Sequence, residues 1–233
     1  MSIEIDFSYH VDGFYHSVNY YRSETPMDAG SMPAPTATGI TGTTFTDTTA
    51  ETGKIYYVRF GSVRDTVEKI SSEIVISTKY FRYYRIYITA NTGLLDGYSE
   101  MQEVELSITT GGADQTTPST PTNQSSYFAT RTAAKLVDND LTGGESIWTS
   151  ADQTFPQWVS FDLLVPKRIT ELRIYPSYFV SGSNEYWKRA PKNFVVQGSN
   201  NNSTWEDIKN FSNVLSWIRG SSKKFNLITG TIT

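Results

Sequence analysis

The sequence predicts an all-β protein of the sandwich or jelly-roll type. Thr, Ser, Gly, Asn and Pro interrupt the chain about every 8 to 12 residues, and the segments between them are rich in Val, Ile, Tyr and Phe, which favour strands. Aromatic residues make up 14% of the 233 residues, which is more apolar surface than a disordered chain carries. The pattern lacks long amphipathic helical periodicity. The chain is therefore expected to fold into packed sheets.

The first expected strands are short runs between turn residues. Val, Ile and Tyr dominate residues 16–22 (HSVNYYR), 54–61 (KIYYVRFG) and 71–77 (SSEIVIS). In the next two strands, 82–90 and 101–109, every second residue is apolar. This alternation indicates that one face of each strand packs inward while the other meets water or a second layer. The alternating residues are Tyr84, Ile86, Ile88, Val104, Leu106 and Ile108.

The later strands show the same composition. They are expected at residues 157–164 (QWVSFDLL), 168–175 (RITELRIY), 193–199 (NFVVQGS) and 222–228 (SKKFNLI). Between the two groups lies a polar stretch, 111–126 (GGADQTTPSTPTNQSS), which has the composition of a linker. We nevertheless interpret it as part of a domain, because of a resemblance described below.

The charge balance along the chain predicts two domains, 1–78 and 79–233. The first 78 residues carry 5 Lys and Arg against 10 Asp and Glu, whereas residues 79–233 carry 15 against 14. The change coincides with the end of an expected strand at Ser77 and Thr78. We therefore place the boundary there, in a short connection without Pro or Gly.

Composition also excludes several classes of function. The net charge of −4 gives no overall electrostatic attraction to nucleic acid or to an anionic membrane. The chain has no Cys, so it has no thiolate nucleophile or thiolate metal site. Its two His, His10 and His16, stand close to the N-terminus, so a His-based catalytic site would have to be built from that short stretch. No apolar run reaches the length of a membrane span, and the start MSIEIDFSYH does not resemble a signal peptide. Because the common catalytic and phosphate-binding motifs are missing as well, we predict that the protein is not an enzyme.

The N-terminal segment resembles a fibronectin type III β-sandwich. The run Gly-Lys-x-Tyr-Tyr-Val-Arg at residues 53–59 is similar to the strand that opens with a corner tyrosine in that family. The resemblance implies that the hydroxyl of Tyr56 bonds back to the preceding turn, and that residues 1–78 form a structural adaptor. The alternative is an aromatic contact between residues 10–21 (HVDGFYHSVNYY) and a partner.

The C-terminal part resembles a discoidin-like, coagulation-factor C-type domain with a galactose-binding-like jelly roll. The resemblance rests on an ordered series of motifs: AAKLVDNDLTGGESIWTS (133–150), PQWVSFDL, ITELRIYP and APKNFVVQGSNNNSTWEDI. In the usual arrangement a strand pair closes the fold, whereas here the matching pair, Tyr83 to Thr89 and Glu100 to Ser107, comes first. This looks like a circular permutation in which the stretch 111–126 leads into the normal start of the domain. A permuted module after a fibronectin-like adaptor resembles the tail-associated proteins of bacteriophages.

The loop from Lys135 to Thr142 is the first candidate site. It crowds oxygen atoms of the kind that Ca²⁺ prefers. The resemblance implies a structural calcium site made by Lys135, Asp138, Asp140 and Thr142, completed by Glu103 from the early strand pair. Asn139 stands where Gly is frequent, so this turn requires a left-handed Asn. The alternative is a turn that Asx side chains hold without metal.

The second candidate is the loop 177–189 (SYFVSGSNEYWKR), where aromatic rings and polar groups alternate. Rings that stack on sugars, together with a few fixed polar groups, form a carbohydrate site. We expect an exposed tryptophan of the segment VLSWIRG to contribute as well. The alternative is that these rings plug the end of the barrel. The candidate carbohydrate-binding residues are Tyr178, Phe179, Asn184, Tyr186, Trp187, Arg189 and Trp217, and the tryptophans expected in the core are Trp148, Trp158 and Trp205.

These observations predict a non-catalytic carbohydrate-binding module of a phage tail or receptor-binding structure. Its expected partners are a bacterial surface polysaccharide and other virion proteins, and its expected location is the virion or the extracellular space. The first alternative is a structural tail protein whose jelly roll contacts other proteins and binds no sugar, because this fold also serves protein contacts. The second is an accessory module of a glycan-degrading enzyme.

Overall fold

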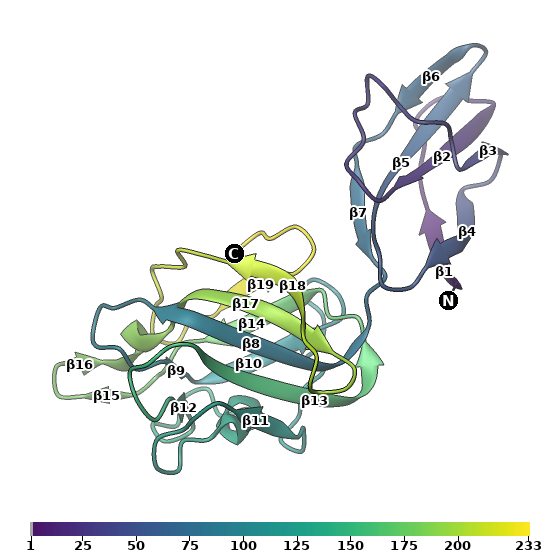
Figure 1. Ribbon diagram of the computed structural model, residues 1–233. Helices are drawn as coiled ribbons and strands as arrows, with labels where there is room; N and C mark the ends of the chain where they lie inside the picture. The colour runs from purple at the N-terminus through teal and green to yellow at the C-terminus, as the bar shows by residue number, and fades with distance from the viewer. Residues whose placement is uncertain (1) are drawn as a thin grey trace. The chain divides into compact units, whose positions relative to one another are not determined.

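A computed structural model describes residues 2–233 and divides the chain into two compact units, one ending at Lys79 and one running from Tyr80 to Thr233. Nearly all regular structure is antiparallel β-strand, with two short 3₁₀ turns at Ala133–Val137 and Tyr186–Arg189 in the described part of the chain. The expected all-β class is therefore confirmed. Figure 1 shows the strands of each unit.

The first unit contains seven strands. They are β1 (Ser2–Ser8), β2 (Ser17–Ser23), β3 (Ala37–Ile40), β4 (Thr44–Glu51), β5 (Ile55–Arg64), β6 (Val67–Ile70) and β7 (Ile74–Ser77). One sheet has the order β3-β2-β5-β6 with β7 beside β5, and β1 pairs with β4. The core centres on Tyr20, whose ring lies 4.7 Å from that of Phe45 and 5.4 Å from that of Phe60, measured between centroids.

The hydrogen bond expected for Tyr56 is present. The backbone N–H of Glu51 donates to the Tyr56 hydroxyl over 3.0 Å, which ties the start of β5 to the end of β4. The Tyr56 ring is buried, and the guanidinium of Arg22 lies 4.7 Å from its centroid. The hydroxyl thus satisfies a backbone donor at the turn before its own strand.

The second unit contains twelve strands. They are β8 (Phe81–Asn91), β9 (Glu100–Met101), β10 (Glu103–Ser107), β11 (Thr122–Gln124), β12 (Trp148–Thr149), β13 (Gln157–Lys167), β14 (Glu171–Tyr175), β15 (Val180–Ser181), β16 (Asn184–Glu185), β17 (Pro191–Ser199), β18 (Glu206–Phe211) and β19 (Lys223–Asn226). The larger sheet has the order β11-β13-β8-β17-β18, and the smaller one the order β10-β14-β19.

Strand β8 is central to the larger sheet, between β13 and β17 (Figure 1). Its alternating residues Tyr84, Ile86 and Ile88 are all buried in the core, as the alternation predicts. Val104 and Leu106 of β10 are buried too, but Ile108 is 43% exposed. That expectation is wrong because β10 ends at Ser107 and the chain then turns away from the core.

The polar stretch after β10 folds back on that strand. The carboxylate of Asp114 accepts the backbone N–H of Leu106 over 2.8 Å, and the N–H of Gln115 donates to the Leu106 carbonyl over 2.7 Å. The stretch 111–126 then continues into β11 of the larger sheet. It is therefore part of the second unit and not a linker between domains.

The tryptophans divide differently from the sequence expectation. Trp148 is fully buried, as expected, and its indole N–H donates to the Ser126 carbonyl over 3.0 Å. Trp158 and Trp205 are only partly buried, so their assignment to the core is wrong. In β13 the core takes Val159 and its alternate neighbours, which directs Trp158 to the opposite face of the sheet.

Candidate functional site

The loop 177–189 forms one wall of a hollow in the second unit. Strands β15 and β16 pair as a small hairpin whose turn begins at Gly182, with a φ of +60° that favours glycine. The 3₁₀ turn Tyr186–Arg189 follows directly and leads into β17. This path brings the side chains at the two ends of the loop toward the same space.

The hollow has a volume of about 290 Å³ and is aromatic on several sides. It is lined by Tyr98, Phe128, Arg131, Thr149, Phe179, Tyr186 and Arg189. The rings of Phe179 and Tyr186 lie 5.0 Å apart, so they form one continuous apolar wall. A concave site with aromatic walls and few polar groups suits a small sugar or a similar ligand.

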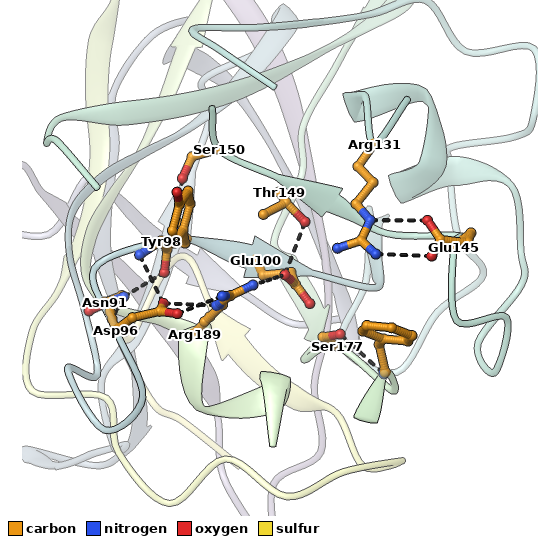
Figure 2. A network of polar contacts seen from close by, with 12 residues as sticks. Asn91, Asp96, Tyr98, Glu100, Arg131, Glu145, Thr149, Ser150, Ser177 and Arg189 are labelled. Carbon is orange, nitrogen blue, oxygen red and sulfur yellow. Dashed lines mark hydrogen bonds and ion pairs between the residues drawn. The ribbon is translucent and has the colours of Figure 1, made fainter. Parts of the chain in front are cut away.

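Arg189, which lines this hollow, is held by two carboxylates (Figure 2). Its Nε donates to Asp96 over 2.8 Å, and its Nη1 donates to Glu100 over 2.9 Å. The guanidinium also lies 4.3 Å from the centroid of the Tyr186 ring and 4.9 Å from that of Tyr98. Although burial lowers the pKa of Arg189, the hydrogen bonds to Asp96 and Glu100 raise it above its usual value.

Glu100 is the buried member of this network. Its side chain is fully buried, and its Oε2 accepts both Arg189 and the Thr149 hydroxyl, the latter over 3.0 Å. Burial raises the pKa of Glu100, because an ionised carboxylate loses its hydration there. The Ser177 hydroxyl and the Arg189 guanidinium oppose that effect. Arg189 is therefore the counter-charge of this buried carboxylate.

Arg131 forms a second arginine–carboxylate pair at the hollow (Figure 2). Its Nε and Nη2 donate to the two carboxylate oxygens of Glu145 over 3.1 and 3.0 Å, the bidentate geometry typical of arginine. Its guanidinium lies 5.1 Å from the centroid of the Phe179 ring. Glu145 is 71% exposed, so this pair lies at the solvent edge, unlike the buried pair of Arg189.

The hollow brings together part of the predicted set. Phe179, Tyr186 and Arg189 line it. Tyr178 does not, because its ring faces the guanidinium of Arg219, 3.9 Å from the ring centroid. Two further residues of the loop lie outside as well, Asn184 in the exposed hairpin and the partly buried Trp187 in the 3₁₀ turn.

The prediction that Trp217 is an exposed binding residue is wrong. Its side chain is 7% exposed and belongs to the hydrophobic core. The indole N–H donates to the Pro191 carbonyl over 3.1 Å, and the ring lies 6.1 Å from that of Phe225. The Trp217 ring therefore packs at the start of β17 and against β19.

Four lining residues were missed by the sequence analysis. Tyr98, Phe128, Arg131 and Thr149 come from the segments before β9, before the first 3₁₀ turn and in β12. They are far from the loop 177–189 along the chain and carry no common spacing. The antiparallel pairing of β9 with β12, together with backbone hydrogen bonds of Phe128 and Arg131 to Thr149, brings these segments together.

A slightly larger hollow, about 320 Å³, lies in the first unit. Its lining includes Phe7, Tyr9, His10 and Phe60. It contains none of the arginine–carboxylate pairs that organise the hollow of the second unit. We therefore take the second unit as the candidate site.

The loop predicted to bind calcium adopts the expected turn. Asn139 has a φ of +62°, the left-handed conformation required of it. The Asp140 carboxylate accepts the N–H groups of Thr142 and Gly143 over 3.1 and 2.7 Å, so it holds the turn. The Asp138 carboxylate accepts the N–H of Asp140 over 3.1 Å and the Ser146 hydroxyl, and the Lys135 ammonium lies 3.7 Å from it.

Glu103 of β10 is a buried carboxylate beside this loop. Its side chain is 1% exposed, one carboxylate oxygen accepts the Asn139 N–H over 3.1 Å, and the other has no partner in the described residues. Burial and the nearby Asp138 carboxylate raise the pKa of Glu103 to about 8. Among residues 2–233 no three His, Asp or Glu side chains converge as a metal-binding group. Glu103 and Asp138 are two carboxylates close enough for the charge of Asp138 to act on Glu103.

No helix of the described residues is long and apolar enough to cross a membrane.

Comparison with known proteins bears on the second unit. Comparisons with curated proteins and with solved structures found no match to this chain. Residues 135–232 match the family model described as a NedA-like, galactose-binding domain. Over these residues the second unit is therefore similar to galactose-binding domains of this family.

Proposed function

We propose that the second unit is a non-catalytic carbohydrate-binding module that takes a sugar of a bacterial surface glycan in the hollow around Arg189. The observation that carries this proposal is the combination of aromatic walls with the Arg189 guanidinium, which two carboxylates hold. Ring faces bind the C–H side of a sugar, and fixed charged groups hold its hydroxyls. The galactose-binding family match supports the same class of ligand.

The setting we propose is a bacteriophage tail, with the first unit as a fibronectin type III-like adaptor. The Tyr56 hydrogen bond to Glu51 supports such a sandwich. The family match begins at residue 135, whereas β8 and β10, which precede it, belong to the same two sheets. This order supports a circular permutation, because strands from both sides of residue 135 complete one fold.

Phe128 and Tyr127 provide a matched test of the hollow. They are neighbours with 50% and 49% exposure, but only Phe128 lines the hollow. On a bacterial glycan array, Phe128→Ala is expected to weaken the strongest interaction by roughly five- to 150-fold, since an aromatic anchor contributes about 1–3 kcal/mol by analogy with interfaces. Tyr127→Ala is expected to stay within twofold of the wild-type protein.

Other outcomes separate the alternatives. Equal loss in both variants, or in neither, contradicts the assignment of the hollow. If the wild-type protein binds no glycan on the array, the structural tail protein is favoured. Depolymerisation of a bound glycan, assayed in parallel, favours the accessory module of an enzyme.

We also propose that Glu103 and Asp138 hold a structural Ca²⁺ with oxygens of the loop 135–142. Calcium supplies positive charge to a buried carboxylate, which then stays ionised. If free calcium is a hundred times its dissociation constant, binding stabilises the fold by about 2.7 kcal/mol. Chelation is therefore expected to lower the melting temperature by roughly 5–10 °C.

Two variants test this calcium site by thermal melting with and without chelator. Asp138→Ala is expected to remove the dependence on calcium. Asp140→Ala is the control, because the Asp140 carboxylate holds the turn: it should lower the melting temperature in both conditions and keep the calcium dependence. If the melting temperature of the wild-type protein is the same with and without chelator, the result supports the metal-free turn.

A further inference from the structure

The outer face of the larger sheet carries a row of polar side chains that crosses all five strands. The pairing registers set Asn123 opposite Ser160, Ser160 opposite Arg85, Arg85 opposite Gln197, and Gln197 opposite Asp207. Paired residues of neighbouring strands point to the same face. The row therefore takes one residue from each of β11, β13, β8, β17 and β18 and extends over four inter-strand spacings, about 19 Å.

Aromatic rings border this row. In the sheet, Trp158 of β13 pairs with Tyr87 of β8 on one side of the row, and Tyr83 of β8 lies on the other side. Trp205, just before β18, lies over the middle of the row. These rings are partly exposed, whereas the alternate residues of the same strands form the core. The outer face of this sheet therefore exposes more aromatic surface than is usual for a sheet face that meets only water.

Arg85 lies at the centre of the row among these rings. Its guanidinium carbon is 4.2 Å from the centroid of the Trp205 ring, 5.3 Å from that of Tyr87 and 5.7 Å from that of Trp158. Its Nε donates to the Gln197 side-chain oxygen over 2.8 Å, and the Gln197 amide donates to Asp207 over 2.6 Å. The three rings and the hydrogen bond to Gln197 therefore hold the guanidinium in one position.

Arg85 differs from four other arginines of the second unit in having no carboxylate partner. Arg82, Arg131, Arg173 and Arg189 each form an ion pair with Asp or Glu. No carboxylate within residues 2–233 lies within ion-pair distance of Arg85, and its two terminal nitrogens are neither buried nor hydrogen-bonded there. Burial lowers the pKa of Arg85, which is the sign of a charge that its surroundings do not compensate.

A second hollow lies along the same face, next to the row. It has a volume of about 180 Å³ and offers mainly hydroxyl, amide and carboxylate groups beside one ring. It is lined by Tyr83, Pro121, Thr122, Asn123, Ser160, Asp162 and Asn202. Two of these residues, Asn123 and Ser160, belong to the polar row itself.

We propose that this outer face binds an extended polysaccharide chain that carries carboxylate groups, with Arg85 gripping one carboxylate through its two free terminal nitrogens. A guanidinium fork matches a carboxylate in a bidentate manner, and a planar cation among aromatic rings is already oriented for it. The rings beside the row contact sugar C–H faces, and the amides and hydroxyls of the second hollow meet sugar hydroxyls. A row of about 19 Å is longer than one sugar, so it fits a chain.

Charge argues for a polysaccharide over nucleic acid. Residues 79–233 have a net charge of only +1, and the central row holds a single cation with Asp207 beside it. A polyphosphate backbone calls for several cations, whereas a sparsely charged sugar chain calls for one. This surface is separate from the hollow around Arg189 and shares with the proposed function only the class of ligand.

The test is affinity electrophoresis of the full chain in gels containing polygalacturonate, alginate or hyaluronate. We expect at least one of these polymers to retard the protein. Arg85→Gln is expected to weaken that retardation at least tenfold, and Arg85→Lys, which keeps the charge but loses the fork, by about threefold. Arg219→Gln is the matched control: it removes an exposed arginine on the Tyr178 ring and is expected to change nothing.

The methyl ester of the retarding polymer removes the charge and keeps the sugar chain, so it is expected to bind no better than Arg85→Gln binds the acid. Phe128→Ala, which alters only the other hollow, is expected to keep wild-type retardation. Retardation by none of the three polymers, equal retardation by acid and ester, or a wild-type response of a folded Arg85→Gln protein overturns the proposal. A change of oligomeric state in Arg85→Gln without loss of polymer binding also overturns it, in favour of a protein-docking face.

Discussion

Trp217→Ala is expected to lower the stability of the second unit by about 3–5 kcal/mol, the cost of removing a large aromatic ring from a packed core. The ring is 7% exposed, and its N–H donates to the Pro191 carbonyl. The substitution removes that donor and leaves a cavity beside Phe225. In a unit of this size the melting temperature should fall by roughly 6–20 °C.

Ile218→Ala is the matched control, since Ile218 follows Trp217 directly and is 64% exposed. Its effect should stay within about 0.5 kcal/mol. Urea unfolding followed by fluorescence measures both variants. A Trp217→Ala protein that unfolds like the wild type but loses glycan binding would contradict the core assignment and restore Trp217 to the binding site.

Arg189→Ala is expected to destabilise the second unit by about 3–5 kcal/mol, because it leaves the carboxylate of Glu100 buried without its counter-charge. Glu100 is fully buried and Arg189 is 12% exposed, so solvent compensates little. The pKa of Glu100, already raised by burial, should rise further. The folded variant then holds a proton that unfolding releases, so its stability should fall as the pH rises above the ordinary titration range of a glutamate and through the raised pKa of Glu100.

Arg131→Ala is the control in the same hollow. Its partner Glu145 is 71% exposed, so the loss should not exceed about 1 kcal/mol. The double variant Arg189→Ala/Glu100→Gln should recover part of the stability, since no buried charge remains. If chemical denaturation finds Arg189→Ala no costlier than Arg131→Ala, Glu100 does not depend on Arg189.

The strand pattern and several local details followed from the sequence. Alternation placed Ile86 and Ile88 in the core, and both are buried. The need for a left-handed residue at Asn139 and the hydroxyl bond of Tyr56 were also predicted correctly. Each of these features depends on contacts among residues close in the chain or on the period of a single strand. Several strands were not expected from the sequence, among them β4 and β18, whose Thr-rich and charged residues do not show that period.

The composition of the candidate site depended on the tertiary structure. Three residues of one loop were predicted, but the segments carrying Tyr98, Phe128, Arg131 and Thr149 reach the hollow through strand pairing and backbone hydrogen bonds between distant parts of the chain. No spacing in the sequence records that pairing, so nothing in the sequence connects these residues to the loop 177–189.

The faces of the tryptophans show the same division. In residues 157–164 the alternation groups Trp158 with Ser160 and Asp162, against the apolar residues of the core face. Period two thus assigns side chains to two faces of a strand, but a large ring is compatible with either face. Which face is covered, and whether a ring such as Trp217 fills a gap or meets solvent, is decided by the other strands and loops that pack there. The sequence determined the strands and their alternation, whereas only the packing of one sheet and its loops against another decided which rings form the core and which remain available to a ligand.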